Sequence, residues 1–159
     1  MNKPLSLLII EDDNAVGETL ASGLSRYGFH CEIRQTMRGA LHLLHSYRPE
    51  AIIADLMLPD SLSPQTIEAF SLLNEYCCVW VITGEGDEMV RKAIEKKGIA
   101  AGYTAKPLIK LDRLAGELKE AIRIDKLNRQ LTKHSEQAAH YADKVQEQLL
   151  ANGSTTNGK

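Results

Sequence analysis

Four polar residues suited to phosphoryl or metal chemistry each stand just past a short apolar run, namely Asp12, Asp55, Thr83 and Lys106. Each run is short enough to be a buried strand. If these strands lie side by side in one parallel sheet, their carboxyl ends share one edge, and the four side chains meet there. Carboxylates, a hydroxyl and an ammonium at one place are the groups that bind a cation and a phosphoryl group.

Carboxylates are concentrated after the first apolar run, where Glu11, Asp12 and Asp13 follow one another. One interpretation is a helix N-terminus, where the helix dipole favours acidic residues and Asp13 or Asn14 acts as the cap. The other is a cation site, because Asp55 ends a second strongly apolar run. Like charges so close need a counter-ion. Magnesium prefers oxygen ligands and keeps waters that a phosphate can displace, so the pattern predicts a Mg²⁺ site.

Two further residues complete a candidate phosphoryl site. The Lys106 ammonium can neutralise one phosphoryl oxygen while the Thr83 hydroxyl donates to another. Gly84, directly after Thr83, allows the backbone a close approach. Taken singly, a solvated surface lysine is the better explanation of Lys106, and a strand-terminal threonine that fills a turn is the better explanation of Thr83. The combination of suitable residue types at four strand ends favours the site.

The elements that must position these residues alternate along the chain, which predicts an α/β fold with a doubly wound five-stranded parallel sheet and five helices over about 125 residues. The predicted strands are Leu5–Ile10, His30–Arg34, Ala51–Ala54, Cys77–Ile82 and Ala100–Tyr103. The predicted helices are Asn14–Tyr27, Met37–Tyr47, Pro64–Tyr76, Asp87–Lys97 and one that begins near Leu111. Trp80 is expected in the core.

Composition narrows the function classes. The chain has 159 residues, 43% of them hydrophobic, and a formal net charge of -2, so no basic surface for nucleic acid or anionic membranes is expected. The start of the sequence lacks the features of a signal peptide, and no apolar run is long enough to span a bilayer. A cytoplasmic protein is therefore expected. Its three cysteines have no CxxC spacing, which argues against a zinc site.

The composition changes after residue 125. We expect a folded domain over 1–125, a helical extension over 126–150 and a disordered tail over 151–159. The extension carries residues at the alternating spacing of a heptad seam, namely Ile124, Leu127, Leu131, His134, Ala138, Tyr141 and Val145. His134 and Ala138 are weak seam residues. The pattern fits either a homodimer formed through this helix or a helix that docks on its own domain or on a partner.

Four motifs together resemble the receiver domain of two-component response regulators, the CheY-like family, over about residues 5–124. They are Leu-Leu-Ile-Ile-Glu-Asp-Asp (7–13), Ile-Ile-Ala-Asp-Leu-Met-Leu-Pro (52–59), Val-Ile-Thr-Gly (81–84) and Tyr-Thr-Ala-Lys-Pro (103–107). The resemblance implies a flavodoxin-like strand order 2-1-3-4-5. It also implies a single receiver domain whose last helix is extended.

The resemblance implies a role for each carboxylate. Asp55 would accept a phosphoryl group from the phosphohistidine of a sensor histidine kinase or a phosphotransfer protein. Glu11 and Asp12 would form the acidic pair, with Asp12 a direct Mg²⁺ ligand. The backbone carbonyl of Met57 would complete the protein ligands together with Asp55.

The same resemblance implies how the signal leaves the site. Thr83 and Lys106 would contact the phosphoryl group, Tyr103 would be the aromatic switch residue, and the Lys106–Pro107 peptide would be cis. The face made by the fourth helix, fifth strand and fifth helix would then change for a downstream protein effector. An alternative for Tyr103 is an amphipathic aromatic at a strand end.

Two positions depart from the family pattern. Ser63 stands where receivers commonly place glycine in the phosphoacceptor loop, which predicts a stiffer or differently shaped loop. The stretch from Thr83 to Lys106 is about one residue longer than usual, which affects the register of the fourth helix and of Tyr103.

Two alternative functions follow from the same residues. An aspartate-nucleophile phosphatase of the haloacid dehalogenase kind needs a second Asp two residues after its nucleophile, and Met57 stands there. We therefore predict no enzyme activity beyond phosphoryl transfer to Asp55. The chain could also be the receiver fragment of a longer DNA-binding regulator, although no helix-turn-helix or basic block follows residue 125.

Overall fold

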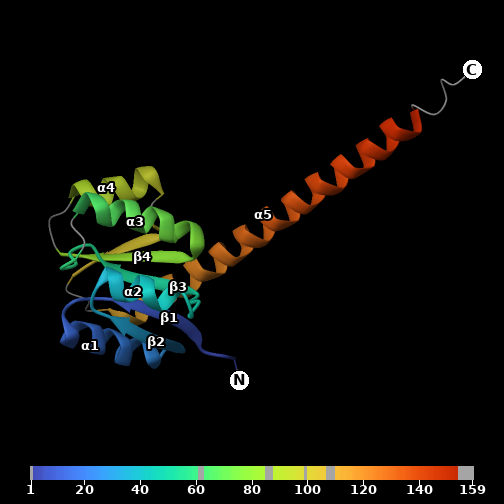
Figure 1. Ribbon diagram of the computed structural model, residues 1–159. Helices are drawn as coiled ribbons and strands as arrows, with labels where there is room; N and C mark the ends of the chain where they lie inside the picture. Colours follow the sequence, from blue (N-terminus) through green and yellow to red (C-terminus); the bar gives the residue numbers. More distant parts are fainter. Residues whose placement is uncertain (1, 61–62, 85–87, 99, 107–109, 154–159) are drawn as a thin grey trace, which may run out of the picture. The chain divides into compact units, whose positions relative to one another are not determined.

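A computed structural model of the chain describes residues 2–60, 63–84, 88–98, 100–106 and 110–153, which form one parallel five-stranded sheet with helices around it (Figure 1). The strand order is β2-β1-β3-β4-β5. The strands are β1 (Leu5–Ile10), β2 (Phe29–Arg34), β3 (Ala51–Asp55), β4 (Cys78–Thr83) and β5 (Gly102–Ala105). The predicted α/β fold and its 2-1-3-4-5 order are confirmed.

Helices pack on both faces of the sheet and bury a separate cluster of apolar side chains on each. The helices are α1 (Asn14–Ser25), α2 (Met37–Leu44), α3 (Ser63–Tyr76), α4 (Glu88–Lys97) and α5 (Leu111–Gly153). The first cluster joins the sheet to α1 and the start of α5, and the second joins it to α2, α3 and α4. The doubly wound arrangement follows from right-handed crossovers between parallel strands.

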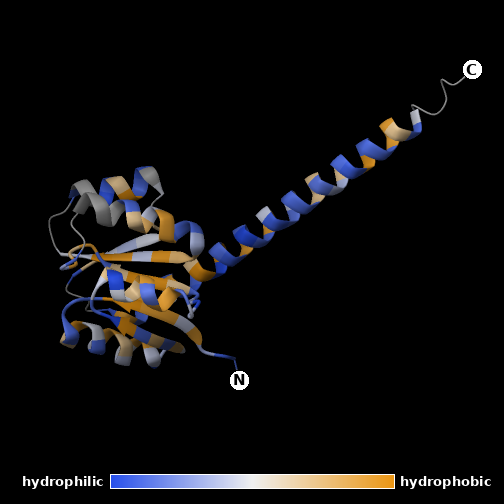
Figure 2. Cartoon of the chain, in the orientation of Figure 1, coloured by the Kyte–Doolittle hydropathy of each residue, from blue (hydrophilic) through white to orange (hydrophobic). Residues whose placement is uncertain are grey.

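The central strands are apolar throughout because they are covered on both faces. Every residue of β3 and of β4 is buried. Figure 2 shows these strands as hydrophobic ribbons, whereas the later part of α5 is mostly hydrophilic. Burial on both faces explains why these runs lack the alternating pattern of a half-exposed strand.

The predicted fifth strand is wrong by two residues. It was expected over Ala100–Tyr103, but β5 begins at Gly102, which pairs with Trp80 of β4. A Cβ atom at Gly102 would lie 2.3 Å from the Trp80 ring, so only glycine fits beneath the indole. The first residue of β5 is thus the one that the Trp80 ring covers.

The first helix ends two residues earlier than predicted. The backbone N–H of Tyr27 donates to the Leu24 carbonyl at 2.9 Å, a tightened final turn. Gly28 follows with φ of 89°, a left-handed conformation that glycine adopts without strain. The predicted helix stop at Gly28 is therefore present as a turn beyond the helix.

The chain divides into two compact units, with the boundary after Arg123. In the first unit α5 buries four residues against the sheet, namely Leu114, Ala115, Leu118 and Ile122. In the second unit α5 continues to Gly153, three residues into the segment predicted as a tail, and its side chains from Lys126 onward are exposed. None of the helices that the structure describes has both the length and the apolar character needed to cross a bilayer.

The structure describes the residues of only one of two expectations about loops. Ser63, which replaces a glycine of the family pattern, is the first residue of α3. The predicted cis peptide between Lys106 and Pro107 lies outside the described residues.

Candidate functional site

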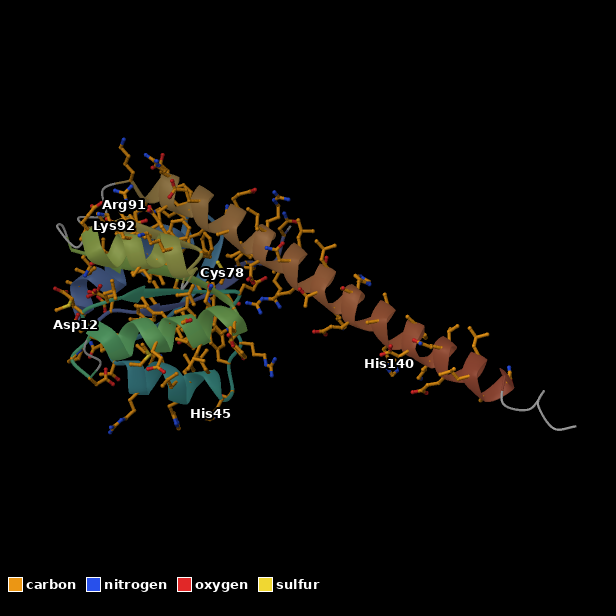
Figure 3. The ribbon with its side chains drawn as sticks, turned by 90° about the horizontal axis from the view of Figure 1, so that it is seen from above. Asp12, His45, Cys78, Arg91, Lys92 and His140 are labelled. Carbon is orange, nitrogen blue, oxygen red and sulfur yellow. The ribbon has the colours of Figure 1, made fainter. Side chains whose placement is uncertain are left out.

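The strand order brings the carboxyl ends of β1 and β3 together at one end of the sheet. These strands are hydrogen-bonded neighbours, and Ile10 pairs with Ala54. The next residues are Glu11 and Asp55, so their carboxylates emerge side by side. Figure 3 shows Asp12 at this end of the sheet, away from Cys78.

Three carboxylates converge here. Oxygen atoms of Glu11, Asp12 and Asp55 lie within 4.8 Å of one another. Glu11 is fully buried and Asp55 is 5% exposed, whereas Asp12 faces solvent. Burial raises the pKa of Glu11, with a smaller contribution from the charge of Asp55, and hydrogen bonds from Lys106 and the Asp13 backbone act against this rise. The cluster is thus an anionic site with one open side.

Lys106, which directly follows β5, is the cationic member of this cluster. Its Nζ atom donates to Asp55 Oδ2 at 2.7 Å and to Glu11 Oε2 at 2.8 Å. Its backbone N–H donates to the Thr83 carbonyl at 2.7 Å, which fixes where the side chain begins. Desolvation lowers the pKa of Lys106, but the bonds to Asp55 and Glu11 outweigh it, so the pKa is raised.

The segment Leu56–Asp60, which the family resemblance identifies as the phosphoacceptor loop, holds one oxygen of the candidate nucleophile. The Met57 backbone N–H donates to Asp55 Oδ1 at 3.0 Å. Leu56 and Leu58 are buried in the core on either side of Met57, whose side chain is 66% exposed. The loop backbone is therefore anchored next to the acidic cluster, with the Met57 side chain turned outward.

Thr83 and Tyr103 lie on one face of the sheet. Thr83 is buried at the end of β4 and pairs with Ala105 of β5. Tyr103 stands two residues before Ala105, so its side chain points to the same face. Its ring packs, half-buried, against the cluster that includes Val81, the residue with which it pairs. Thr83 and Tyr103 are therefore diagonal neighbours on adjacent strands.

Sequence reasoning correctly offered Asp13 as a helix cap. Asp13 is the N-cap of α1, and its carboxylate accepts the Val16 backbone N–H at 3.1 Å. It is engaged there and is not part of the three-carboxylate cluster.

Two other contacts near the site were not predicted. Trp80 Nε1 donates to Thr104 Oγ1 at 2.8 Å, beside Tyr103. The Asp60 carboxylate accepts backbone N–H groups of α2. Both contacts join segments more than twenty residues apart in the sequence, so no local sequence pattern predicts them.

The donor set suits a hard divalent cation. Three carboxylates and one ammonium leave two formal negative charges within the cluster when all are ionised. Carboxylate oxygens, one of them on the exposed Asp12, are the ligands that Mg²⁺ takes while it keeps several waters. The residues present therefore fit magnesium.

Comparison with curated proteins finds response regulators. The chain is 31% identical over 102 residues to the photosynthetic apparatus regulatory protein RegA of Rhodobacter capsulatus, covering 64% of this chain and 55% of that protein. It is 28% identical over 124 residues to the response regulator MprA of Mycobacterium ulcerans, covering 76% of this chain and 51% of that protein. The chain thus spans about half the length of these relatives.

Solved structures share the fold. A response regulator receiver domain protein from Clostridium thermocellum superposes with a TM-score of 0.68 at 20% identity, over 77% of this chain and 98% of that one. A response regulator receiver protein from Burkholderia phymatum gives a TM-score of 0.63 at 24% identity, over 74% and 94%. The chain therefore shares its fold with proteins to which it has low sequence identity.

The family comparison covers most of the chain. Residues 7–119 match the response regulator receiver domain, a range that begins within β1 and includes the other four strands and every member of the acidic cluster. The chain belongs to the response regulator receiver domain family.

Proposed function

We propose that this receiver accepts a phosphoryl group on Asp55 and switches a protein-interaction surface in response. The observation that carries the proposal is the 2.7 Å contact between Asp55 and Lys106 inside the acidic cluster. Receiver domains are signalling modules, and the relatives are response regulators, which implies histidine kinases and effectors as partners. A sensor histidine kinase or a phosphotransfer protein would supply the phosphoryl group.

The transfer needs one nucleophile and groups that offset charge. A carboxylate oxygen of Asp55 attacks phosphorus in line, the P–N bond of the donor phosphoimidazole breaks, and its electron pair stays on the imidazole nitrogen. Lys106 already points at Asp55 and offsets negative charge at the transferring group. Thr83, buried at the end of the adjacent strand, supplies a hydroxyl donor.

The acidic residues would hold magnesium. Asp12, Asp55 and the Met57 backbone carbonyl would be the protein ligands, and Glu11 would complete the acidic pair. When bound, Mg²⁺ supplies positive charge next to the phosphoryl oxygens. Glu11, deeply buried and bonded to Lys106, keeps the ammonium between the two inner carboxylates.

The conformational change would be passed from Thr83 to Tyr103. A phosphoryl oxygen that draws the Thr83 hydroxyl toward Asp55 changes the space beside Tyr103 on the same sheet face. The modification shifts the equilibrium because the Thr83 contact exists in one state and not in the other. The surface around α4, β5 and α5 is the proposed output for a protein effector.

The test is phosphoryl uptake from a small phosphoramidate donor with Mg²⁺, followed by intact mass. Wild type should gain one phosphoryl group, and Asp55→Asn should gain none. Asp13→Asn is the matched control, because Asp13 is the adjacent acidic side chain that caps α1. Uptake by Asp55→Asn equal to wild type contradicts the proposal. Sustained turnover of a phosphate ester would instead support the phosphatase alternative, which the family assignment does not favour.

We also propose that the α5 extension pairs with a second copy of the chain. Large apolar residues recur on it at heptad spacing and are exposed, including Leu127, Leu131 and Tyr141. Such a face on an otherwise polar helix is typical of a coiled coil. Sedimentation of the full chain should give a dimer that Leu131→Lys weakens and Thr132→Lys does not. A monomer for the unmodified chain, with and without phosphoryl donor, contradicts pairing.

A further inference from the structure

The first turn of α2 is capped by the phosphoacceptor loop. Asp60 Oδ1 accepts the backbone N–H of Met37 at 2.9 Å, and its Oδ2 accepts that of Arg38 at 2.8 Å. These are the first two N–H groups of the helix, which have no partner inside it. A single carboxylate from another part of the chain therefore satisfies both.

The helix also has its own cap, which makes the contribution of Asp60 separable. Thr36 is the N-cap, and its Oγ1 accepts the Gly39 N–H at 3.0 Å. Thr36 precedes the helix directly, whereas Asp60 lies more than twenty residues further along the chain. Both residues stabilise the same turn, but Asp60 alone of the two belongs to the loop that follows Asp55.

The capping carboxylate is held in its charged form. The N–H of Arg38 is the main cause that lowers the pKa of Asp60, and the N–H of Met37 acts in the same direction. A negative charge at a helix N-terminus is favoured by the helix dipole. The contact is thus a charge-assisted one, stronger than that of a neutral cap.

The loop is consequently fixed at both ends. At its start the Leu56 N–H donates to the Ile82 carbonyl at 3.2 Å, and the Met57 N–H donates to Asp55. At its other end Asp60 is tied to α2. The backbone of Met57 lies between the Leu56 and Asp60 anchors and is itself bonded to Asp55 of the acidic cluster.

We propose that Asp60 is a positioning residue for phosphoryl transfer, which holds the phosphoacceptor loop so that the Met57 backbone carbonyl and the Asp55 carboxylate face the cation together. The inference rests on the proposed function of Asp55. It also makes α2 sensitive to the loop, because a shift of Asp60 breaks both hydrogen bonds that its carboxylate accepts from the first turn of that helix.

The experiment compares Asp60→Ala, Asp60→Asn and Thr36→Val in the full chain. Three quantities are measured: Mg²⁺ affinity by calorimetry, the rate of phosphoryl uptake at limiting and saturating Mg²⁺, and amide hydrogen exchange in the first turn of α2. Thr36→Val is the matched control, since it weakens the same turn without touching the loop. Asp60→Asn keeps one oxygen acceptor and serves if Asp60→Ala does not fold.

We expect the Asp60 variants to change Mg²⁺ affinity and the Thr36 variant to leave it unchanged. Asp60→Ala should weaken Mg²⁺ binding by about fivefold, the effect of losing an ordinary cap, with slower uptake mainly at limiting Mg²⁺. Asp60→Asn should lie between it and wild type, and Thr36→Val should speed hydrogen exchange in α2 with Mg²⁺ affinity unchanged. Equal effects of Asp60→Ala and Thr36→Val on Mg²⁺ affinity, or no effect of Asp60→Ala, overturn the proposal. If wild type takes up no phosphoryl group, the proposed function fails, while Mg²⁺ affinity and exchange still decide the role of Asp60.

Discussion

Lys106 Nζ lies 2.8 Å from Oε2 of Glu11, a carboxylate that is fully buried. The same ammonium lies 2.7 Å from Asp55, so one cation is shared between an inner carboxylate and the candidate nucleophile. Lys106 offsets part of the free-energy cost of removing these two carboxylates from water. This sharing links the stability of the fold to the chemistry of the site.

Removing the shared cation should destabilise the fold. In metal-free buffer, Lys106→Met should lower the free energy of unfolding by about 2 kcal/mol, because buried charge is left unpaired. Glu11→Gln combined with Lys106→Met should recover part of this loss. Urea unfolding of the two single variants and the double variant measures the coupling. Strictly additive effects would show that the pair contributes nothing.

The raised pKa of Glu11 predicts a pH effect of defined sign. The folded state holds the Glu11 proton to higher pH than the unfolded state does, so this group lowers stability as pH rises through its folded pKa. In metal-free buffer, the unfolding free energy of Glu11→Gln should therefore rise relative to that of wild type as the pH increases above about 4.5, the ordinary pKa of a glutamate. Lys106 stays charged at neutral pH because its own pKa is raised. A difference in unfolding free energy that is constant with pH would contradict the prediction.

Thr83 should be needed more for the conformational response of β5 than for phosphorylation of Asp55. Thr83→Ala should still take up a phosphoryl group on Asp55, at a rate reduced by about tenfold or more, since one hydrogen-bond donor is lost. The change in amide hydrogen exchange of β5 on phosphorylation should disappear. Thr83→Ser keeps the hydroxyl and is the control. A full β5 response in Thr83→Ala would rule out the proposed link to Tyr103.

The bond between Trp80 and Thr104 should stabilise the edge strand. Trp80→Phe removes the donor to Thr104 Oγ1 and should lower the free energy of unfolding by about 1–2 kcal/mol. Thr104→Val removes the acceptor at nearly constant shape. A double-mutant cycle by thermal unfolding should give a coupling energy of about 1 kcal/mol. A coupling energy of zero would mean that the bond is replaced by water.

Two glycines should respond in opposite ways to the same substitution. Gly102→Ala places a Cβ atom 2.3 Å from the rigid Trp80 ring and should cost about 2–3 kcal/mol of stability through overpacking. Gly116 lies within helix α5, and a Cβ atom there meets nothing within 4 Å, so Gly116→Ala should add about 0.5–1 kcal/mol. Urea unfolding of both variants tests the pair. A neutral Gly102→Ala would show that the indole can move.

The strand ends could be predicted from the sequence because continuous apolar runs mark strands covered on both faces. Parallel order then places the residues that follow Ile10 and Ala54 at one edge, as the structure confirms. The depth of each carboxylate could not be predicted. Glu11 and Asp12 are adjacent and chemically alike, yet one is buried and the other is exposed. The buried one, Glu11, accepts a hydrogen bond from Lys106, which lies almost a hundred residues away in the sequence.

Contacts between segments far apart in the chain could not be predicted from the sequence either, because they depend on how the strands pair. Gly102 begins β5 directly beneath the Trp80 ring, and Asp60 caps α2 from a segment far along the chain. A glycine and an aspartate are common in loops, so neither residue type indicates its partner. Register and long-range capping become visible only once the strands are paired.

Trp80 is the single tryptophan of the chain, and its N–H is bonded to a residue of the edge strand beside Tyr103. The tryptophan fluorescence of the unlabelled protein therefore comes from one indole, which is bonded across β4 and β5. A shift of β5 that lengthens this bond changes the surroundings of the fluorophore directly. The protein thus carries its own optical probe at the strand where its signal is expected to emerge.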